Sequence, residues 1–174
     1  LFSMNCYKYN YNNECLGVTP GGISGFWYSL KKIKEYNKNS YTCASSGCLA
    51  VICKDLDYNY IFNTAKEIRA LNLTIEGKKN LFIRKIMSIV DYIPDVKIIT
   101  MSLTLNSCIL TKPNGKKDLI NLLIKTTDIP YITANNYTSE IDGGFCFFFI
   151  NDCNKNIYIP WDYNFIINVF NDKL

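Results

Sequence analysis

The sequence is organised around residues 41–50, which read Tyr41-Thr42-Cys43-Ala44-Ser45-Ser46-Gly47-Cys48-Leu49-Ala50. A short strand-like approach over residues 40–43 reaches Ser45, and an apolar, helix-like run follows from Cys48 to Cys53. A nucleophile elbow has this order, because its serine sits on a tight strand-to-helix turn and a small residue two places later lets the helix pack closely. The usual spelling is G-x-S-x-G, and Cys43 stands here for the first glycine. Ser-Ser-Gly is also ordinary turn chemistry, so the motif alone leaves both interpretations open.

A second strand–turn–helix pattern precedes the first. Residues 14–19 predict a short buried strand, residues 20–25 (Pro-Gly-Gly-Ile-Ser-Gly) a glycine-rich turn, and the apolar positions Phe26, Trp27, Leu30 and Ile33 an amphipathic helix. Such a turn can cradle a phosphate or an oxyanion with its N–H groups, or it can simply need the flexibility of glycine. The spelling fits neither a P-loop nor a dinucleotide fingerprint. Two such units in succession are typical of an α/β protein with parallel strands.

The rest of the chain continues this alternation. We expect residues 1–13 to form an N-terminal extension and residues 14–174 one compact domain. Helices are predicted at 64–71, with Thr64 as the cap, at 81–92, ended by Pro94, at 118–125 and at 165–170; strands are predicted at 97–105, 108–111 and 156–159, and the apolar run Phe145–Ile150 is predicted as a core strand.

Composition bounds the class of protein. The chain has 174 residues, of which 48% are hydrophobic and 20% charged, as in a globular domain. Its net charge of +4 (19 basic against 15 acidic residues) is scattered, which excludes a nucleic-acid footprint. It would suit an anionic lipid surface or a solvated one. Residues 1–4 lack the features of a signal peptide, and no apolar run could cross a bilayer. We therefore expect a cytoplasmic protein.

Eight cysteines occur without paired CxxC spacing, which disfavours a zinc ribbon. Four of them (Cys48, Cys53, Cys108 and Cys146) lie inside apolar runs, where a free cysteine behaves as a small hydrophobe. We therefore expect free thiols and a reducing compartment. A disulfide that involves the early Cys6 and Cys15 remains open.

The chain contains no histidine. This excludes Ser-His-Asp and Cys-His catalysis, HExxH metalloproteases and histidine-based metal sites. If Ser45 is a nucleophile, its proton must pass to a carboxylate, a lysine, a tyrosine or water.

A third motif, Asp142-Gly143-Gly144, comes near the end of the chain. By itself it could be a turn. Taken in order, however, strand–GGxxG–helix, strand–xxSxG–helix and Asp-Gly-Gly in a chain without histidine resemble the patatin-like phospholipases. The resemblance covers residues 14–160, including a helix from Asp118 that leads to Ile129-Pro130 and a strand at 156–160.

The resemblance implies a three-layer α/β sandwich, with a mostly parallel sheet between helices, and a Ser-Asp dyad in place of a triad. By position, Ser45 is similar to the nucleophile and Asp142 to the general base, while Gly21 and Gly22 are similar to the oxyanion hole. The glycines at 25, 47, 143 and 144 match the family's structural motif positions. No metal or cofactor is implied. The implied substrate is an ester lipid, either a phospholipid or an acylglycerol, and the implied location is peripheral at membranes or lipid droplets.

Several positions depart from the family pattern. Pro20 stands for a third glycine of the turn, Ser24 for a frequent basic residue, Cys43 for the first elbow glycine, and Phe145–Phe149 for an Asn-x-Pro segment. The alternative to a lipid acyl hydrolase is therefore a catalytically inactive lipid- or membrane-binding protein on the same scaffold. Its interfacial helix would carry aromatic and lysine residues at 26–34. A third interpretation, coincidental motifs on an unrelated α/β fold, predicts that Ser45 and Asp142 lie far apart.

Overall fold

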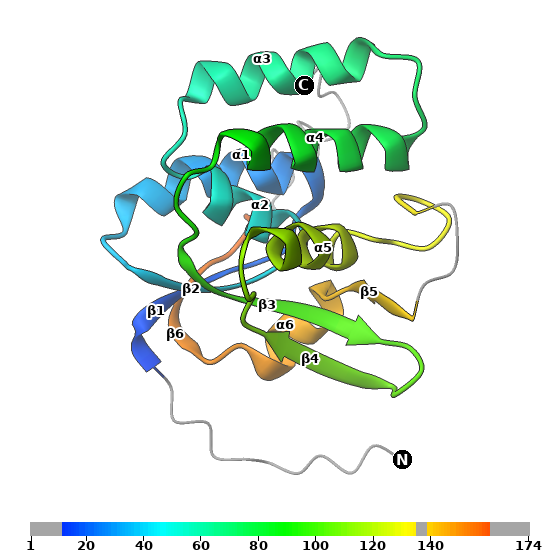
Figure 1. The fold of residues 1–174 in the computed structure, drawn as a ribbon. Helices are drawn as coiled ribbons and strands as arrows, with labels where there is room; N and C mark the ends of the chain where they lie inside the picture. Colours follow the sequence, from blue (N-terminus) through cyan, green and yellow to red (C-terminus); the bar gives the residue numbers. More distant parts are fainter. Residues whose placement is uncertain (1–11, 135–138, 161–174) are drawn as a thin grey trace.

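A six-stranded, mostly parallel β-sheet forms the centre of the computed structural model, which describes residues 12–134 and 139–160 (Figure 1). The elements in chain order are β1 (Asn12–Val18), α1 (Gly22–Lys32), the 3-10 turn η1 (Ile33–Glu35), β2 (Ser40–Ala44), α2 (Ser46–Cys53), α3 (Tyr58–Ala70), α4 (Ile75–Ile89), β3 (Asp95–Ser102), β4 (Ser107–Thr111), α5 (Lys116–Thr126), β5 (Glu140–Asp142), α6 (Gly144–Ile150) and β6 (Cys153–Ile157). The predicted mixed α/β fold is confirmed.

The strand order is β4-β3-β2-β1-β6, and the four strands from β3 to β6 in this order run parallel to one another. β4 lies antiparallel at one edge. β3 extends beyond β2: it pairs with β2 as far as Ala44 opposite Ile99, and its next residue, Thr100, pairs with Asp142 of β5. β4 occupies the other side of β3, so β2 and β5 lie end to end along one side of it. Their carboxyl ends therefore meet.

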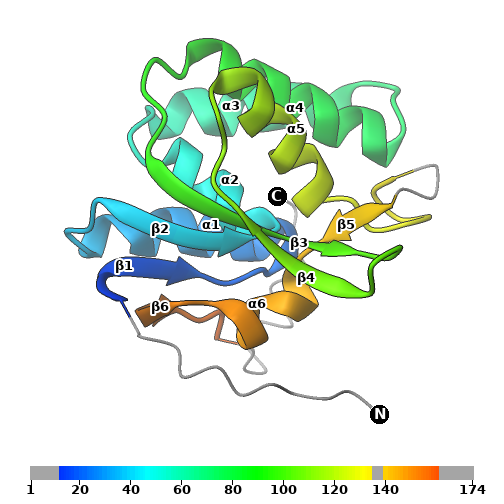
Figure 2. The ribbon, with the colours of Figure 1, turned by 60° about the horizontal axis from the view of Figure 1, so that its bottom comes forward.

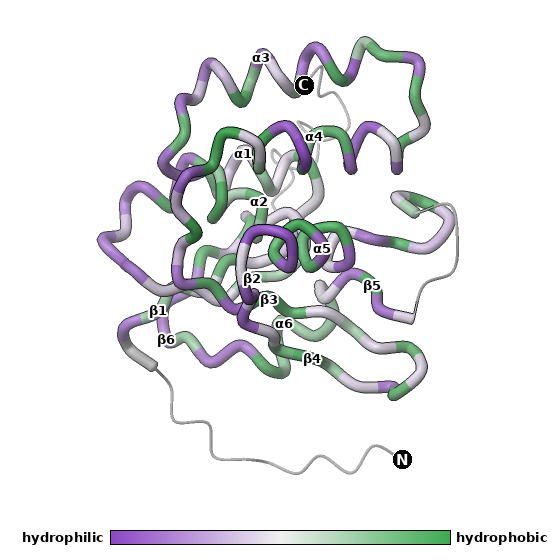
Figure 3. The backbone as a smooth tube through the Cα atoms, in the orientation of Figure 1, coloured by the Kyte–Doolittle hydropathy of each residue, from purple (hydrophilic) through white to green (hydrophobic). Residues whose placement is uncertain are grey.

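Helices cover both faces of the sheet unequally. Figures 1 and 2 show α1 to α5 on one face and α6 on the other. Successive residues of β3 point to opposite faces, and Ile98 accordingly belongs to the large core under α1 to α5, whereas Ile99 packs with Phe147 of α6 in a small second core. In Figure 3, hydrophobic and hydrophilic residues alternate along α3, α4 and α5, as expected of helices that bury one side.

Three predicted boundaries are corrected by the structure. β1 begins at Asn12, inside the expected extension, and the rest of that extension lies outside the described residues. Thr64 is not a cap; it is buried within α3, whose first turn is capped by the Asp57 carboxylate accepting from Tyr60 N–H. α4 begins earlier than predicted, at Ile75, because the Thr74 hydroxyl caps it. The predicted helix at 165–170 also lies outside the described residues.

The apolar run 145–150 is a helix, α6, and the predicted core strand is wrong. Helix α6 begins directly after Gly143, whose carbonyl accepts hydrogen bonds from the N–H groups of Cys146 and Phe147. A short run of continuous apolar residues has no periodicity that separates a strand from a buried helix. Here the helical turn directs Phe147 onto the sheet and leaves Phe145 outside.

The cysteines of the described residues form three disulfides, so the expectation of free thiols at Cys48, Cys108 and Cys146 is wrong. Cys6, for which a disulfide was left open, lies outside the described residues. The bonds join Cys15 of β1 to Cys153 of β6, Cys43 of β2 to Cys48 of α2, and Cys108 of β4 to Cys146 of α6. Sequence spacing does not report which strands are neighbours, and apolar surroundings suit a half-cystine as well as a thiol. Cys53 is free and buried, as predicted, and burial raises the pKa of its thiol.

Among the residues that the structure describes, no helix combines the length and the apolar character that would be needed to span a bilayer.

Candidate active site

Ser45 and Asp142, which are 97 residues apart in sequence, are in direct contact. The Ser45 hydroxyl donates to Asp142 Oδ2 at 2.5 Å. The cause is the sheet topology: Ser45 follows the last residue of β2, Asp142 is the last residue of β5, and these two ends meet beside β3. This short contact is not what coincidental motifs would predict.

Ser45 has the backbone conformation of an elbow. Its φ of 52° and ψ of −133° place a non-glycine residue at positive φ, where the cost is about 1–3 kcal/mol and the surrounding contacts must hold it. The serine occupies the N-cap position of α2, but its hydroxyl does not cap that helix. It is directed to Asp142 instead. The Cys43–Cys48 disulfide encloses this turn and joins the strand before it to the helix after it.

Two glycines allow the backbones around the dyad to approach closely. A Cβ at Gly47 would lie 2.5 Å from the carbonyl oxygen of Val18, so only glycine lets the start of α2 pack against the end of β1. A Cβ at Gly143 would lie 2.0 Å from the carbonyl oxygen of Ile99. The two glycines therefore allow the segments next to Ser45 and Asp142 to lie directly against strands β1 and β3.

The glycine turn lies against the elbow. Gly21 is the N-cap residue of α1, and its N–H donates to the Ser46 hydroxyl at 3.1 Å. Gly22 follows at φ 62° as the first helical residue, where N–H groups have no acceptor within the helix. Gly25 closes the turn, because its N–H donates to the Gly21 carbonyl at 2.9 Å. Pro20 contributes no N–H to this turn.

Asp142 is held at three points. Its Oδ1 accepts from Gly144 N–H at 2.7 Å, its Oδ2 accepts from Ser45, and its own N–H donates to the Asp128 carbonyl at 2.9 Å. Burial raises the pKa of the Asp142 carboxyl, and the hydrogen bonds from Ser45 and Gly144 only partly oppose this. The carboxylate is therefore a stronger base than an ordinary aspartate, as a serine deprotonation without histidine requires.

Three residues near the dyad were not found by sequence reasoning. Thr126, at the end of α5, accepts the Ser45 N–H at 2.9 Å. Asp128 and Lys79 form an ion pair with little exposed surface, and the charges of both influence the pKa of Asp142. Burial raises the pKa of Asp128, and the Lys79 ammonium opposes that rise. No motif marks these positions, because their roles arise only when α4 and α5 pack beside β5.

Most of the aromatic residues that follow Asp142 are exposed on the surface of the molecule and do not line a pocket around the dyad. Phe147 is buried, but Phe145 and Phe148 are 82% and 67% exposed. Ile23, the residue after Gly22, is 74% exposed. Large apolar side chains thus stand in solvent directly beside the segments that carry the glycine turn and the dyad aspartate.

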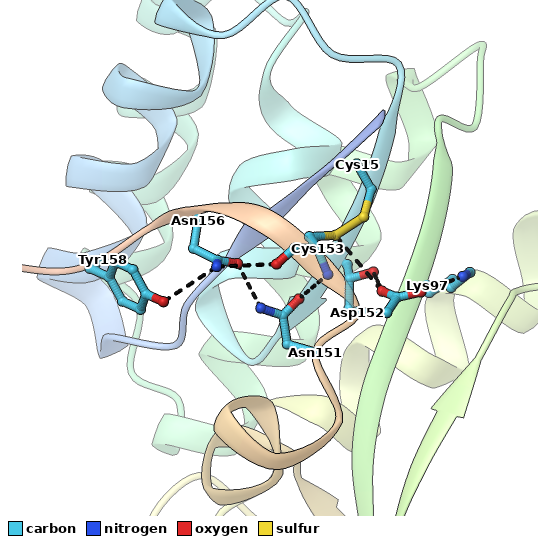
Figure 4. The surroundings of a disulfide bond; sticks show 8 residues. Cys15, Lys97, Asn151, Asp152, Cys153, Asn156 and Tyr158 are labelled. Atoms are coloured by element: carbon cyan, nitrogen blue, oxygen red, sulfur yellow. Dashed lines mark hydrogen bonds and ion pairs between the residues drawn. A yellow bond between two sulfur atoms is a disulfide. The ribbon is translucent and has the colours of Figure 1, made fainter. Parts of the chain in front are cut away.

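A group of metal-ligand residue types occurs at the other end of the sheet, around Cys15, Asp152 and Cys153. Figure 4 shows why these residues do not form a metal site: the two sulfur atoms are bonded to each other, which leaves one carboxylate. That carboxylate accepts from Lys97 and from Thr42, each at 2.7 Å. Burial alone would raise the pKa of Asp152, but the hydrogen bonds from Lys97 and Thr42, together with the charge of Lys97, lower it. The Asp152 carboxylate, which directly precedes β6, thus links that strand to Thr42 of β2 and to Lys97 of β3.

Comparison of the sequence with protein-family models and with curated proteins finds no match in either set. Any assignment of function therefore depends on the motifs and on the geometry described above.

Proposed function

We propose that this chain is a lipid acyl hydrolase that cleaves ester bonds of phospholipids or acylglycerols through a Ser45–Asp142 dyad. The observation that supports it best is the 2.5 Å hydrogen bond between a serine at positive φ and a half-buried aspartate, in a chain that has no histidine. The fold would then be a patatin-like sandwich of three layers, with α6 as the thin third layer.

In this mechanism the Ser45 oxygen attacks the ester carbonyl carbon while its proton passes to Asp142. The oxyanion of the tetrahedral intermediate is held by the N–H groups of Gly21 and Gly22. For this, the Gly21 N–H exchanges its present acceptor, the Ser46 hydroxyl, for the substrate oxygen. The intermediate expels the alcohol, which takes the proton from Asp142, and leaves an acyl group on Ser45.

Water completes the cycle. Asp142 accepts a proton from the water molecule that attacks the acyl-enzyme, and it returns this proton to the Ser45 oxygen as the fatty acid leaves. No step in this scheme uses a metal or a cofactor. The raised pKa of Asp142 assists both proton transfers, because it brings the base nearer to the working pH.

The proposed substrate class is supported by the surroundings of the dyad. Ile23 and Phe145 are exposed large apolar side chains that follow the glycine turn and Asp142, respectively. Such side chains favour contact with a lipid surface over a polar substrate in water. The same observation favours the second candidate, an inactive lipid-binding protein, so chemistry must separate the two.

A fluorophosphonate probe separates them, because it reacts only with an activated serine. We expect stoichiometric labelling of the parent protein at Ser45, located by mass spectrometry, and hydrolysis of a p-nitrophenyl ester. Ser45→Ala should lose both. Ser88→Ala is the control, because it removes an exposed serine hydroxyl that donates to the Lys85 carbonyl of α4 and should leave the labelling unchanged. A Ser45→Ala protein that hydrolyses the ester at the parental rate would exclude the proposed enzyme. A panel of lipids would then be used only to test the second candidate, the inactive lipid-binding protein.

A further inference from the structure

We propose that Thr126 is a positioning residue of the dyad, whose hydroxyl holds the Ser45 backbone in the elbow conformation. The inference rests on the proposed hydrolase function for its catalytic consequence. The hydrogen bond itself can be tested without activity.

The hydroxyl of Thr126 forms hydrogen bonds with two backbone groups. Thr126 Oγ1 accepts from Ser45 N–H at 2.9 Å and donates to the Ile99 carbonyl oxygen at 2.7 Å. A threonine hydroxyl has one proton, and this proton is committed to Ile99, so its lone pairs are left for the Ser45 N–H. The directions of both bonds are thereby fixed.

The location of this bridge explains its importance. Ala44 and Ile99 are the last pair of the β2–β3 ladder, and the chain leaves the sheet at Ser45. Thr126 lies at this point, fully buried with 0% of its surface exposed, so no water replaces it as a partner. A buried N–H without a partner is costly. The threonine therefore supplies the acceptor that lets Ser45 leave the strand at positive φ.

The same segment also holds the base. Two residues after Thr126, the Asp128 carbonyl accepts the N–H of Asp142 at 2.9 Å. The segment from Thr126 to Asp128, at and just after the end of α5, thus contacts the backbones of Ser45, through a side chain, and of Asp142, through a carbonyl. Loss of the Thr126 hydroxyl should change one contact and spare the other. The Ser45 oxygen would then shift relative to Asp142 without disturbing the aspartate.

The test compares Thr126→Val, which removes the hydroxyl at equal shape, with Thr126→Ser, which keeps it. Thr127→Val is the matched control, because the Thr127 hydroxyl is also buried but donates only to carbonyls of α5. The readouts are the rate constant of fluorophosphonate labelling, kcat and KM for a p-nitrophenyl ester, amide hydrogen exchange at Ser45, and thermal unfolding.

We expect Thr126→Val to label about 10–100-fold more slowly, because displacement of a reacting group by about 1 Å can cost a factor of this size. The loss should fall on kcat with KM unchanged, and the Ser45 amide should exchange faster. Thr126→Ser and Thr127→Val should stay within about threefold of the parent, since a preserved bond or an unrelated one costs little.

Two results would overturn the inference. One is a folded Thr126→Val protein that reacts at the parental rate, and the other is unchanged exchange of its Ser45 amide. If Thr126→Val does not fold, equal loss of reactivity in Thr126→Ser would overturn the inference as well. An unreactive parent protein would instead reject the hydrolase function, and amide exchange would still decide whether Thr126 holds Ser45.

Discussion

At Asp142, the raised pKa on which the proposed mechanism depends also makes the folded protein less stable near neutral pH. Burial raises its pKa above the ordinary value, so the folded protein binds a proton there more tightly than the unfolded chain does. The contribution of this group to stability is therefore greatest at acidic pH, below the unfolded pKa. It decreases as the pH rises towards the folded pKa.

Asp142→Asn should separate stability from activity. The amide oxygen can still accept from Gly144 N–H and the amide NH₂ can donate to the Ser45 oxygen, but no charge is buried. We expect the melting temperature to exceed that of the parent by a few degrees at pH 8, with the difference shrinking towards pH 4. We expect kcat/KM to fall by about 10²–10⁴-fold, because a general base is lost. Thermal melts across this pH range measure the first effect, and a lower melting temperature at pH 8 would contradict it.

At the scale of elements, the packing of α2 against β1 places Ser45, the proposed nucleophile. Gly47→Ala would set a Cβ 2.5 Å from the Val18 carbonyl and 2.7 Å from that of Thr19. These are backbone atoms and cannot move aside alone. We expect a loss of about 1–3 kcal/mol in the free energy of unfolding, the usual cost of overpacking, together with slower probe labelling.

Gly77→Ala is the control for this prediction, measured by the same urea unfolding experiment. Its Cβ would lie 3.2 Å from the Thr74 hydroxyl and 3.6 Å from the Leu73 Cβ, at the beginning of α4, and no backbone atom outside its own helix is as near. Alanine is a better helix former than glycine by about 0.5–1 kcal/mol, so stability should change little or increase. Equal losses in the free energy of unfolding from the two substitutions would show that the close approach of α2 to β1 does not require glycine at position 47.

The sequence predicts elements well where periodicity is strong and poorly where it is absent. The two strand–turn–helix units appear in the structure close to their predicted bounds, because each has turn residues followed by an amphipathic or apolar run. α6 was predicted as a strand, since a wholly apolar run of this length fits both states.

The candidate site divides in the same way. Ser45 and Asp142 were found because motifs mark them, and their contact is a fact of the sheet topology that spacing alone does not give. Thr126 and the Lys79–Asp128 pair carry no motif and act only through tertiary packing. The disulfides were missed for a related reason, because which strands are neighbours decides which cysteines meet.

For the whole molecule, the disulfides join the sheet to itself and to the helices on both of its faces. They close sequence separations of 138, 38 and 5 residues. If they act by restricting the unfolded chain, their contributions are about 5, 4 and 2 kcal/mol in that order, because the entropy of loop closure grows with the logarithm of length.

Pairwise Cys→Ser variants test this ranking by chemical unfolding, after the bonds are located by mass spectrometry without reduction. We expect Cys15→Ser/Cys153→Ser to lose most stability and Cys43→Ser/Cys48→Ser to lose least. The latter variant should nevertheless lose the most probe reactivity, because its bond encloses Ser45. Free thiols at all six positions in the purified, unreduced protein would contradict the prediction.

The bond between Cys15 and Cys153 links the first described strand to the last. It turns the backbone between them into a covalent ring that contains both Ser45 and Asp142. A single protease nick in any loop of this ring would release no fragment, because the two sides of the cut stay joined through the disulfide. The nicked molecule would run as one species on a gel until a reductant separated its two pieces.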